Sequence, residues 1–341
     1  MKLRLLAPDD ELLGSEDLDA PDAAELDAAL HRLGSADAVG HRIVHGGTDY
    51  TGAVEIDDLV VERLRALTDL APLHQPKSLA ALDAVMAALP GVPSVACFDT
   101  AFHATLPEAA ATYAIPRDWW RRRHVRRYGF HGLSHAYASR RAAEMGGGVR
   151  VVSCHLGAGA SLAAVLDGRS VDTTMGFTPL EGLVMATRSG NVDPGLLLWL
   201  LEHEEVDTAA LQQALEHESG MLALAGSADM REVLARDDPE ARLALDVYVH
   251  RLRASIAAMT ASLGGLDALV FTGGVGENAA PVRARAAAGL AYLGVAIDEA
   301  ANADAVPDAD VSAAGAAVRT LVIAAREDLE IAWQVREVLG G

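Results

Sequence analysis

Three short apolar segments joined by tight turns are the feature that most limits how this chain can fold. They span Val151–His155, Leu162–Leu166 and Ser170–Thr173. The small-residue sequence G-A-G-A-S follows the first segment, and Asp167-Gly168 forms a hairpin turn before the third. Backbone N–H groups of a small-residue loop can face inward and hold phosphate. The pattern therefore predicts a strand meander with a candidate phosphate loop at its first turn.

Strands and helices alternate on both sides of this meander, as is typical of an α/β fold. Apolar residues spaced three and four apart predict a long amphipathic helix from Leu245 to Leu263. The acidic stretch Asp9–Asp22 and the glycine-rich T-G-G-V-G-E-N segment (272–278) are expected to be loops. Residues 300–314 resemble a low-complexity linker. The remaining predicted elements are strands at 3–6, 38–45, 92–98, 266–271 and 317–324, and helices at 23–33, 56–67, 79–89, 196–202 and 280–290, with a further helix at the end of the chain.

Charge and hydropathy exclude several classes of protein. The 341 residues include 48 acidic and 28 basic ones, a net charge of −20, which argues against a general nucleic-acid binder. The longest apolar run, Leu196–Leu201, is far shorter than the roughly 18–20 residues that span a bilayer. The opening segment Met1–Leu6 is too short for a signal peptide, because acidic residues follow it directly. Cys97 and Cys154 lie in apolar segments, which is typical of a protein in a reducing compartment. The sequence predicts an intracellular protein with no membrane or nucleic-acid partner.

Lysine is almost absent, which restricts the chemistry of phosphate binding. Lys2 and Lys77 are the only lysines, and no G-x-x-x-x-G-K-[ST] sequence occurs, so a P-loop NTPase is excluded. Arginine must therefore supply any charge for phosphate or carboxylate. Arg42 and Val44 are predicted to share one strand face next to Gly46-Gly47, opposite His41, Ile43 and His45. This suits a small carboxylate with an apolar tail; the alternative is a surface arginine on an edge strand.

Other polar motifs allow two interpretations each. Asp99, His103, His131 and His135 lie within a short stretch but lack the spacing of a zinc site, so packing or hydrogen bonding is the alternative. Arg188 lies in the glycine-containing loop of P-L-E-G-L-V-M-A-T-R-S-G-N-V-D-P-G, where it either binds a ligand or caps the loop. The G-G-V-G-E-N sequence only weakly matches a dinucleotide fingerprint, so an NAD-dependent oxidoreductase is disfavoured. The basic run 117–127 (R-D-W-W-R-R-R-H-V-R-R) is expected to be a solvated loop or a subunit contact.

Together these stretches resemble the acetate kinase (acetokinase) family of the acetate and sugar kinase/Hsp70/actin superfamily. The matching sequences are HRIVHGG, LAPLHQP, CFDTAFHATLP, RYGFHGLSH, the long block HLGAGASLAAVLDGRSVDTTMGFTPLEGLVMATRSGNVDPG, ESGMLALAGSADMRE and LDALVFTGGVGENAAPVR. The resemblance implies an α/β fold of two RNase H-like, actin-like ATPase domains with the active site in the cleft between them. The implied domains are 1–99 plus 328–341, and a nucleotide-binding domain at 100–327. A cytoplasmic homodimer is also implied.

The resemblance further implies the reaction. This is the reversible transfer of the ATP γ-phosphoryl group to acetate, giving acetyl phosphate and ADP, with Mg²⁺ or Mn²⁺ as the metal. Acetate is already ionised at pH 7, so catalysis reduces to aligning two anions and neutralising charge on the moving phosphoryl group. Planar, permanently charged arginines suit that task.

By the family pattern, Arg42 binds the carboxylate or phosphoryl group, Arg188 and His131 stabilise the transition state, and Asp99 is the essential acidic residue. Glu327 falls where the family has a magnesium-associated glutamate. The implied methyl pocket comprises Val44, Leu73, Phe130 and Pro179. The implied nucleotide-binding residues are His155, Leu156, Gly157, Ala158 and Gly159, then Asp229, Met230 and Arg231, and finally Gly274, Val275, Gly276, Glu277 and Asn278.

The chain departs from the family pattern at a few positions near the phosphates. Nothing before Ala38 resembles the family's opening N-A-G-S-S-S-x-K loop, and an edge strand of the first sheet is expected to be missing. Ala158, Gln75 and Arg326 replace family residues in HLGNG, APLHNP and TNEEL. These departures leave two alternatives to an active acetate kinase: a catalytically impaired nucleotide-binding relative, or a propionate kinase.

Overall fold

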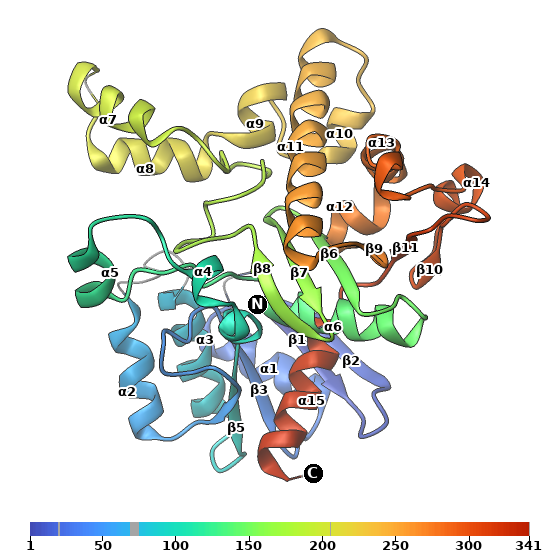
Figure 1. The fold of residues 1–341 in the computed structure, drawn as a ribbon. Helices are drawn as coiled ribbons and strands as arrows, with labels where there is room; N and C mark the ends of the chain where they lie inside the picture. The colour runs from blue at the N-terminus through green and yellow to red at the C-terminus, as the bar shows by residue number, and fades with distance from the viewer. Residues whose placement is uncertain (20, 69–74, 205, 341) are drawn as a thin grey trace. The chain divides into compact units, whose positions relative to one another are not determined.

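The computed structural model describes residues 1–19, 21–68, 75–204 and 206–340, and the chain separates into two compact units (Figure 1). Unit 1 comprises Met1–Ala104 and Arg326–Gly341, and unit 2 comprises Thr105–Ala325. The domain division expected from the resemblance, at 99/100 and 327/328, stays a prediction. Within the described ranges, no helix has both the length and the apolar character needed to cross a membrane.

Unit 1 contains a three-stranded sheet and a separate hairpin. The sheet has the order β3-β5-β4, with β3 (Val39–Ile43) parallel to β5 (Ser94–Phe98) and β4 (Val54–Glu55) antiparallel to β5. Residues Ile43, Leu64, Leu82 and Phe98 form the centre of its core. The helices of this unit are α1 (Ala23–Leu33), α2 (Asp58–Ala66), α3 (Gln75–Ala88) and α15 (Glu327–Leu339).

Helix α15 brings the end of the chain back to the β3–β5 sheet. A Cβ atom on Gly40 of β3 would lie 2.2 Å from Cγ2 of Ile331, so only glycine permits this close approach. The N-terminus of α15, which carries Glu327, is thereby fixed within unit 1.

The first hairpin corrects the expectation of a loop at Asp9–Asp22. Strands β1 (Lys2–Leu6) and β2 (Leu12–Asp17) pair antiparallel, with Lys2 opposite Asp17. The acidic side chains of β2 have cationic partners: Asp17 pairs with Arg4, and Glu16 with Arg32 of α1. The acidic composition wrongly indicated a loop, because charged residues on the open side of a hairpin do not oppose strand formation.

Unit 2 contains a six-stranded sheet of order β10-β11-β9-β6-β7-β8. Strands β6 (Arg150–Leu156), β7 (Ala160–Leu166) and β8 (Arg169–Thr173) form the predicted meander, and β9 (Ala268–Thr272) runs parallel to β6. The edge next to β9 carries β11 (Arg319–Val322) and β10 (Ala309–Asp310). The meander prediction is confirmed.

The two longest helices of unit 2 pack on the central strands of this sheet. Helix α11 (Pro239–Leu263) contacts β6, β7 and β8, and α6 (Gly132–Glu144) contacts β6 and β9. The other helices are α4 (Glu108–Ala111), α5 (Arg117–Arg123), α7 (Pro194–His203), α8 (Thr208–His217), α9 (Gly220–Ala225), α10 (Met230–Leu234), α12 (Gly273–Asn278), α13 (Ala280–Ala288) and α14 (Glu299–Ala303).

Two expectations about loops in unit 2, at 272–278 and 300–314, are wrong. At 117–127 the expected loop is partly a helix without buried residues, and the alternative of a subunit contact stays a prediction. The basic run at 117–127 begins with helix α5, and the glycine-rich segment at 272–278 forms helix α12. The stretch 300–314, expected to be a linker, contains most of α14 and all of β10. Glycine and charge indicated loops at these places, yet short helices accept both when neighbouring segments supply their terminal hydrogen bonds.

Candidate active site

The first cluster of predicted site residues is built at the ends of β3 and β5. Arg42 is the next-to-last residue of β3, and Asp99 directly follows β5. The Arg42 guanidinium donates to both Asp99 oxygens, with 2.7 Å between Nη2 and Oδ2. Glu327, the first residue of α15, has its Oε2 atom 3.4 Å from Arg42 Nη1. The structure therefore joins these three predicted site residues in one ion-pair cluster.

Charge and burial act together in this cluster. Asp99 is the main group that raises the pKa of Arg42, and Glu327 adds to this effect, so the guanidinium keeps its charge. Burial raises the pKa of Glu327, the negative charge of Asp99 raises it further, and Arg42 opposes both. The Asp99 side chain is buried, whereas 43% of the Arg42 side chain is exposed. An anion could thus approach Arg42 from solvent while the carboxylates hold the guanidinium in place.

The side chains of β3 and the residues after it alternate as predicted. His41, Ile43 and His45 are buried, whereas Arg42 is exposed and Val44 is half-buried. This places the predicted carboxylate-binding arginine and the predicted methyl-pocket valine on the same face. Burial lowers the pKa of both His41 and His45 to about 4, so these rings are neutral near pH 7.

Buried polar groups fix the turn that follows Val44. The Gln75 side chain accepts from the His45 backbone N–H at 3.3 Å and donates to the His45 carbonyl at 3.2 Å. The backbone N–H of Gly46 donates to Thr100 Oγ1 at 3.0 Å. Gln75 is fully buried, so the amide that differs from the family pattern has a structural role in unit 1.

The second cluster lies in unit 2 and contains histidines bonded to serines. His131 precedes α6 in the left-handed backbone conformation, with φ of 57°, and its Nδ1 lies 2.9 Å from Ser161 Oγ. Nε2 of His135 lies 2.8 Å from the same hydroxyl. The His155 ring stacks on His131 at a centroid distance of 4.3 Å, and its Nδ1 lies 2.7 Å from Ser134 Oγ. These bonds fix the orientation of His131 at the β6–β7 turn.

Gly159 brings the β6–β7 turn against two predicted catalytic side chains. A Cβ atom on Gly159 would lie 3.2 Å from both Cε1 and Nε2 of His131 and 3.6 Å from Nη1 of Arg188. Nη1 of Arg188 also donates to the Pro179 carbonyl at 3.4 Å. The Ala186 N–H donates to the Ala158 carbonyl at 3.1 Å, which ties the Arg188 loop to this turn. The structure thus brings His131, Arg188 and the predicted phosphate loop together.

Burial lowers the pKa of Arg188, while Glu216 acts in the opposite direction. A guanidinium that has lost part of its hydration gains more from an incoming anion than an exposed one does. Arg188 is therefore suited to bind negative charge. Its bond to the Pro179 carbonyl also fits the alternative role as a loop cap, so ligand binding by Arg188 stays a prediction.

A polar network missed by sequence reasoning supports the Pro179 loop. Nη1 of Arg127 donates to the carbonyls of residues 173–175 at 3.1–3.2 Å, and its Nη2 lies 2.6 Å from Glu181 Oε1. Glu181 also accepts from the Tyr113 hydroxyl, which in turn accepts from the Phe177 N–H at 2.9 Å. Burial raises the pKa of Tyr113, so its phenol stays protonated. Arg127 belongs to the basic run that composition suggested was solvated.

Helix α12 carries the predicted nucleotide-binding residues 274–278. Gly274 and Asn278 are exposed, whereas Gly276 is buried. Oε1 of Glu277 accepts from the backbone N–H groups of Gly273 at 3.0 Å and Ala325 at 2.9 Å. A Cβ atom on Gly157 would lie 4.0 Å from the Gly274 nitrogen, so α12 begins beside the β6–β7 turn. Glu277 therefore has a structural role, and Gly274 and Asn278 are the accessible members of the set.

The predicted nucleotide-binding residues Asp229, Met230 and Arg231 lie at the start of α10. Asp229 caps this helix by accepting from the Arg231 N–H at 2.8 Å, and the Arg231 side chain folds back to pair with Asp229 at 2.6 Å. The Arg231 side chain lies at the surface, where 88% of it is exposed. Met230, by contrast, is buried.

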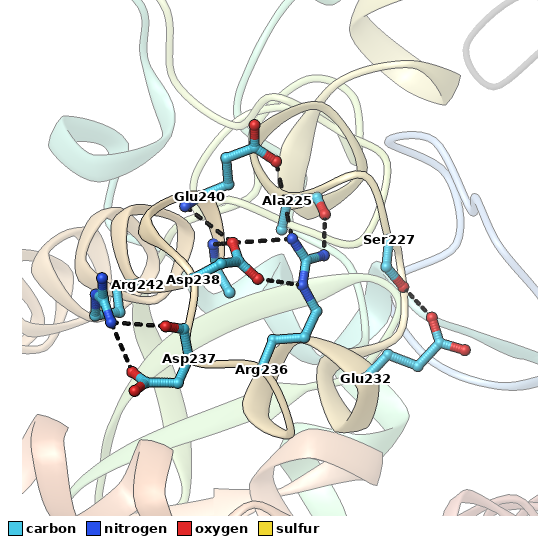
Figure 2. A network of polar contacts seen from close by, with 9 residues as sticks. Ala225, Ser227, Glu232, Arg236, Asp237, Asp238, Glu240 and Arg242 are labelled. Atoms are coloured by element: carbon cyan, nitrogen blue, oxygen red, sulfur yellow. Dashed lines mark hydrogen bonds and ion pairs between the residues drawn. The ribbon is translucent and has the colours of Figure 1, made fainter.

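A polar network holds the chain on both sides of α10 (Figure 2). Arg236 donates to the Ala225 carbonyl and pairs with Asp238, whose Oδ2 is 2.6 Å from Nε. Ser227 Oγ donates to Glu232 at 2.6 Å and accepts from the Asp229 N–H at 3.1 Å. The network fixes the loop before α10 and the start of α11, so the position of Asp229 is determined by several contacts.

The remaining predicted residues differ in how accessible they are. Phe130 is 2% exposed and Leu156 is fully buried, so Leu156 can offer a ligand only its backbone. Pro179 and Val275 are half-buried. Leu73 lies outside the described residues.

The histidine motifs hold no metal site in the part of the chain that the structure describes. No group of three or more His, Cys, Asp or Glu side chains there could bind a metal ion. His135 bonds to Ser153 and Ser161, and His103 is buried with a ring contact to Phe102. Hydrogen bonding and packing, the alternative interpretation, therefore applies to these two residues.

Comparison with protein families and curated sequences gives consistent matches. The acetokinase family model matches residues 22–333. An acetate kinase from Nostoc punctiforme is 49% identical over 317 residues, which cover 90% of this chain and 78% of that protein. An acetate kinase from Gloeobacter violaceus is 51% identical over 308 residues, covering 87% of this chain and 76% of that protein.

Solved structures match the fold over most of the chain. A crystal structure of Porphyromonas gingivalis acetate kinase has a TM-score of 0.87 at 34% identity and covers 99% of this chain and 90% of that one. A crystal structure of a propionate kinase from Francisella tularensis has a TM-score of 0.84 at 40% identity, covering 88% and 79%. These likenesses confirm the predicted α/β fold class.

Proposed function

The chain belongs to the acetokinase family, and on that premise we propose that it transfers the γ-phosphoryl group of ATP to acetate in a reversible reaction. The products are acetyl phosphate and ADP. An acetate oxygen forms a bond to the γ-phosphorus, and the bond between that phosphorus and the β–γ bridging oxygen breaks, which leaves the electron pair on ADP. The observation that carries this proposal is the placement of Arg188 and His131 at the β6–β7 turn.

The proposal assigns roles that fit the chemistry of each group. Acetate is a carboxylate at neutral pH and needs no general base, so the barrier depends on alignment and charge neutralisation. Arg188 would stabilise charge on the moving phosphoryl group, with His131 donating a hydrogen bond to it. Arg42 would bind the acetate carboxylate or the phosphoryl oxygens, held by Asp99.

Nucleotide binding is assigned to three segments of unit 2. The β6–β7 turn (His155–Gly159) would take the phosphates through its backbone N–H groups. Helix α12 begins beside this turn, which supports a role for Gly274 and Asn278 in the same site. Asp229–Arg231 at the start of α10 would contact the adenosine side.

The donor set around Arg42 fits a magnesium ion. Mg²⁺ prefers oxygen ligands and usually keeps several waters while one or two carboxylates and the substrate phosphates complete its shell. Glu327 and Asp99 are carboxylates that lie on the same guanidinium, and these residues would hold the metal. When bound, Mg²⁺ would neutralise charge on the nucleotide phosphates. Mn²⁺ suits the same oxygen donors.

The methyl pocket is assigned to Val44, Leu73, Phe130 and Pro179. The likeness to the propionate kinase structure favours propionate as a second candidate substrate. One methylene in an apolar pocket changes specificity by only about 1–3 kcal/mol, so both acids are expected to react. Comparison of kcat/KM for acetate and propionate, in wild type and Val44→Ala, tests this; the variant should shift preference towards propionate.

We also propose that the chain acts in the cytoplasm as a homodimer. Helix α7 supports the second point, because none of its residues is buried, and Leu196, Leu198 and Trp199 are exposed by 47%, 62% and 47%. A second copy of the chain is the occupant we assign to this apolar face.

A hydroxamate assay tests the catalytic proposal directly. Protein, acetate and Mg-ATP are incubated with hydroxylamine, which converts acetyl phosphate into acetyl hydroxamate. Wild type should give product, and Arg188→Ala should lose on the order of a hundredfold or more in kcat. Arg231→Ala is a matched control, since its exposed guanidinium is assigned to nucleotide binding and should affect mainly KM for ATP.

The assay also separates this proposal from the impaired-relative alternative. If wild type gives no more hydroxamate than Arg188→Ala while ADP still raises the melting temperature, the chain binds nucleotide without transferring phosphate. That outcome would contradict the proposed activity and support the alternative.

A further inference from the structure

Arg283 of α13 is a buried cation that has no carboxylate partner among the residues the structure describes. It is 1% exposed, and its guanidinium donates to four oxygen atoms that carry no charge. Nη1 contacts the carbonyls of Gly276 at 2.9 Å and Glu277 at 2.7 Å, and Nε contacts Asn302 Oδ1 at 2.7 Å. Nη2 donates to the Asn302 carbonyl at 2.7 Å. Burial lowers the pKa of Arg283, which reflects the cost of placing a charge there.

Two of these oxygen atoms belong to the end of α12. The last carbonyls of a helix have no intrahelical partner and carry the negative end of the helix dipole. Arg283 satisfies the Gly276 and Glu277 carbonyls from the first turn of the next helix. A cation is favourable at that location, and its position fixes where α12 ends.

Asn302 of α14 completes the arrangement. Its Oδ1 accepts from Arg283, and its Nδ2 donates to the Ala280 carbonyl at 3.0 Å. Asn302 is 3% exposed. One buried amide thus holds the Arg283 side chain and the α12–α13 junction at the same time.

The start of α12 is fixed independently. Glu277 binds the Gly273 and Ala325 N–H groups, and a Cβ atom on Gly276 would lie only 3.3 Å from the Phe271 carbonyl carbon. Helix α12 therefore has restraints at both ends, and its accessible residues, Gly274 and Asn278, are the ones assigned to the nucleotide.

We infer that Arg283 and Asn302 are positioning residues for nucleotide binding, which hold α12 at the distance from the β6–β7 turn that ATP and ADP require. This inference rests on the proposed nucleotide site. Neither residue is exposed enough to touch the nucleotide, so both act through α12. Loss of the Asn302 amide should weaken ADP and ATP binding while acetate binding is unchanged.

The test compares Asn302→Ala with Asn302→Asp. The alanine variant removes the acceptor for Nε of Arg283, whereas the backbone contact to Nη2 remains and supports folding. We expect Kd for ADP and KM for ATP to rise about tenfold, because a buried donor loses its partner. KM for acetate and kcat at saturating ATP should stay within about twofold. Asn302→Asp restores the acceptor and should bring ADP affinity closer to wild type than the alanine variant.

Glu299→Ala, on the first turn of α14, is the matched control. Glu299 is exposed, so its loss should leave ADP affinity unchanged. The inference is overturned if Asn302→Ala lowers the melting temperature without changing ADP affinity, or if it raises KM for acetate and ATP equally. Since ADP affinity is measured by calorimetry without turnover, a wild type that binds ADP but transfers no phosphate would contradict the proposed activity alone.

Discussion

Single residues in this molecule are constrained by side chains from distant parts of the sequence, and Gly159 is the clearest case. The residue lies at the β6–β7 turn, where a Cβ atom would press on the His131 ring and approach Arg188. Its backbone does not require glycine, so the constraint comes from the His131 ring. The lack of a side chain at Gly159 therefore leaves room for His131 beside the β6–β7 turn.

Gly159→Ala should fold and lose activity. The added methyl group must push the His131 ring by a few tenths of an ångström. Misplacement of a catalytic group is costly, so kcat is expected to fall about tenfold or more. Gly52→Ala is the control, because open space surrounds Gly52. Equal kcat values for Gly159→Ala and wild type, at equal melting temperatures, would argue against a role for His131 at this turn.

We expect the buried histidines at 41 and 45 to make unit 1 sensitive to acid. Their pKa values are lowered to about 4, against about 6.5 for an unfolded histidine. The unfolded state therefore binds more protons between these values, so this contribution to stability is full above pH 6.5 and falls as pH drops towards 4. Each residue should cost about 3 kcal/mol of unfolding free energy over that interval.

Denaturant unfolding at several pH values measures this effect. His41→Gln should flatten the decrease between pH 6.5 and pH 4, whereas His31→Gln, at an exposed position on α1, should follow the wild-type curve. A His41→Gln variant with the same pH dependence as wild type would show that the buried ring does not set the acid sensitivity.

At the scale of elements, most of the sheet and the long helices could be predicted from the sequence. The meander at 151–173 and the α11 helix follow from apolar periodicity and turn residues, which are local properties. Strand β2 and helix α12 could not be predicted, because their stability depends on partners far along the chain. Glu16 needs Arg32, and α12 needs Arg283 together with Ala325.

The candidate site shows the same division. Motif matching indicated Arg42, Asp99 and Glu327, and the structure joins them; it also joins His131, Arg188 and Gly159. The supporting residues were missed, since Arg127, Glu181 and Arg283 act only through contacts that no local pattern reveals. Residues that touch ligands recur as motifs, whereas their supports are defined by three-dimensional packing.

Helix α7 gives a prediction about assembly. If a second copy covers its apolar face, Leu198→Glu places a charge in that interface and should convert the dimer into a monomer. Light scattering after size-exclusion chromatography measures the mass of each form. Leu243→Glu is the matched control, because Leu243 is similarly exposed, at 56%, on α11. A dimer that survives Leu198→Glu would assign the contact to another surface.

At the scale of the whole molecule, the proposed roles fall in different units. Arg42, Asp99 and Glu327 belong to unit 1, whereas the predicted nucleotide-binding residues belong to unit 2. We propose that both clusters serve one reaction. Because the chain has a net charge of −20, its arginine clusters are the sites expected to attract anions.

Hydrogen exchange with ADP should map this division. Bound ADP should slow amide exchange in residues 156–159 and 273–278, because it favours the state in which these amides are engaged. The β1–β2 hairpin serves as the internal control and should exchange equally fast with and without ADP. Protection confined to unit 1 would contradict the assignment of the nucleotide site.

The return of α15 to unit 1 has a consequence for biosynthesis. A ribosome releases residues 1–104 first, then all of unit 2, and only afterwards the segment that carries Glu327 and packs on Gly40. Unit 2 is continuous and can acquire its structure while the chain is still growing, whereas the earliest-made part must wait for its closing helix. During translation, unit 2 is therefore expected to complete its fold before unit 1, although synthesis of unit 1 begins first.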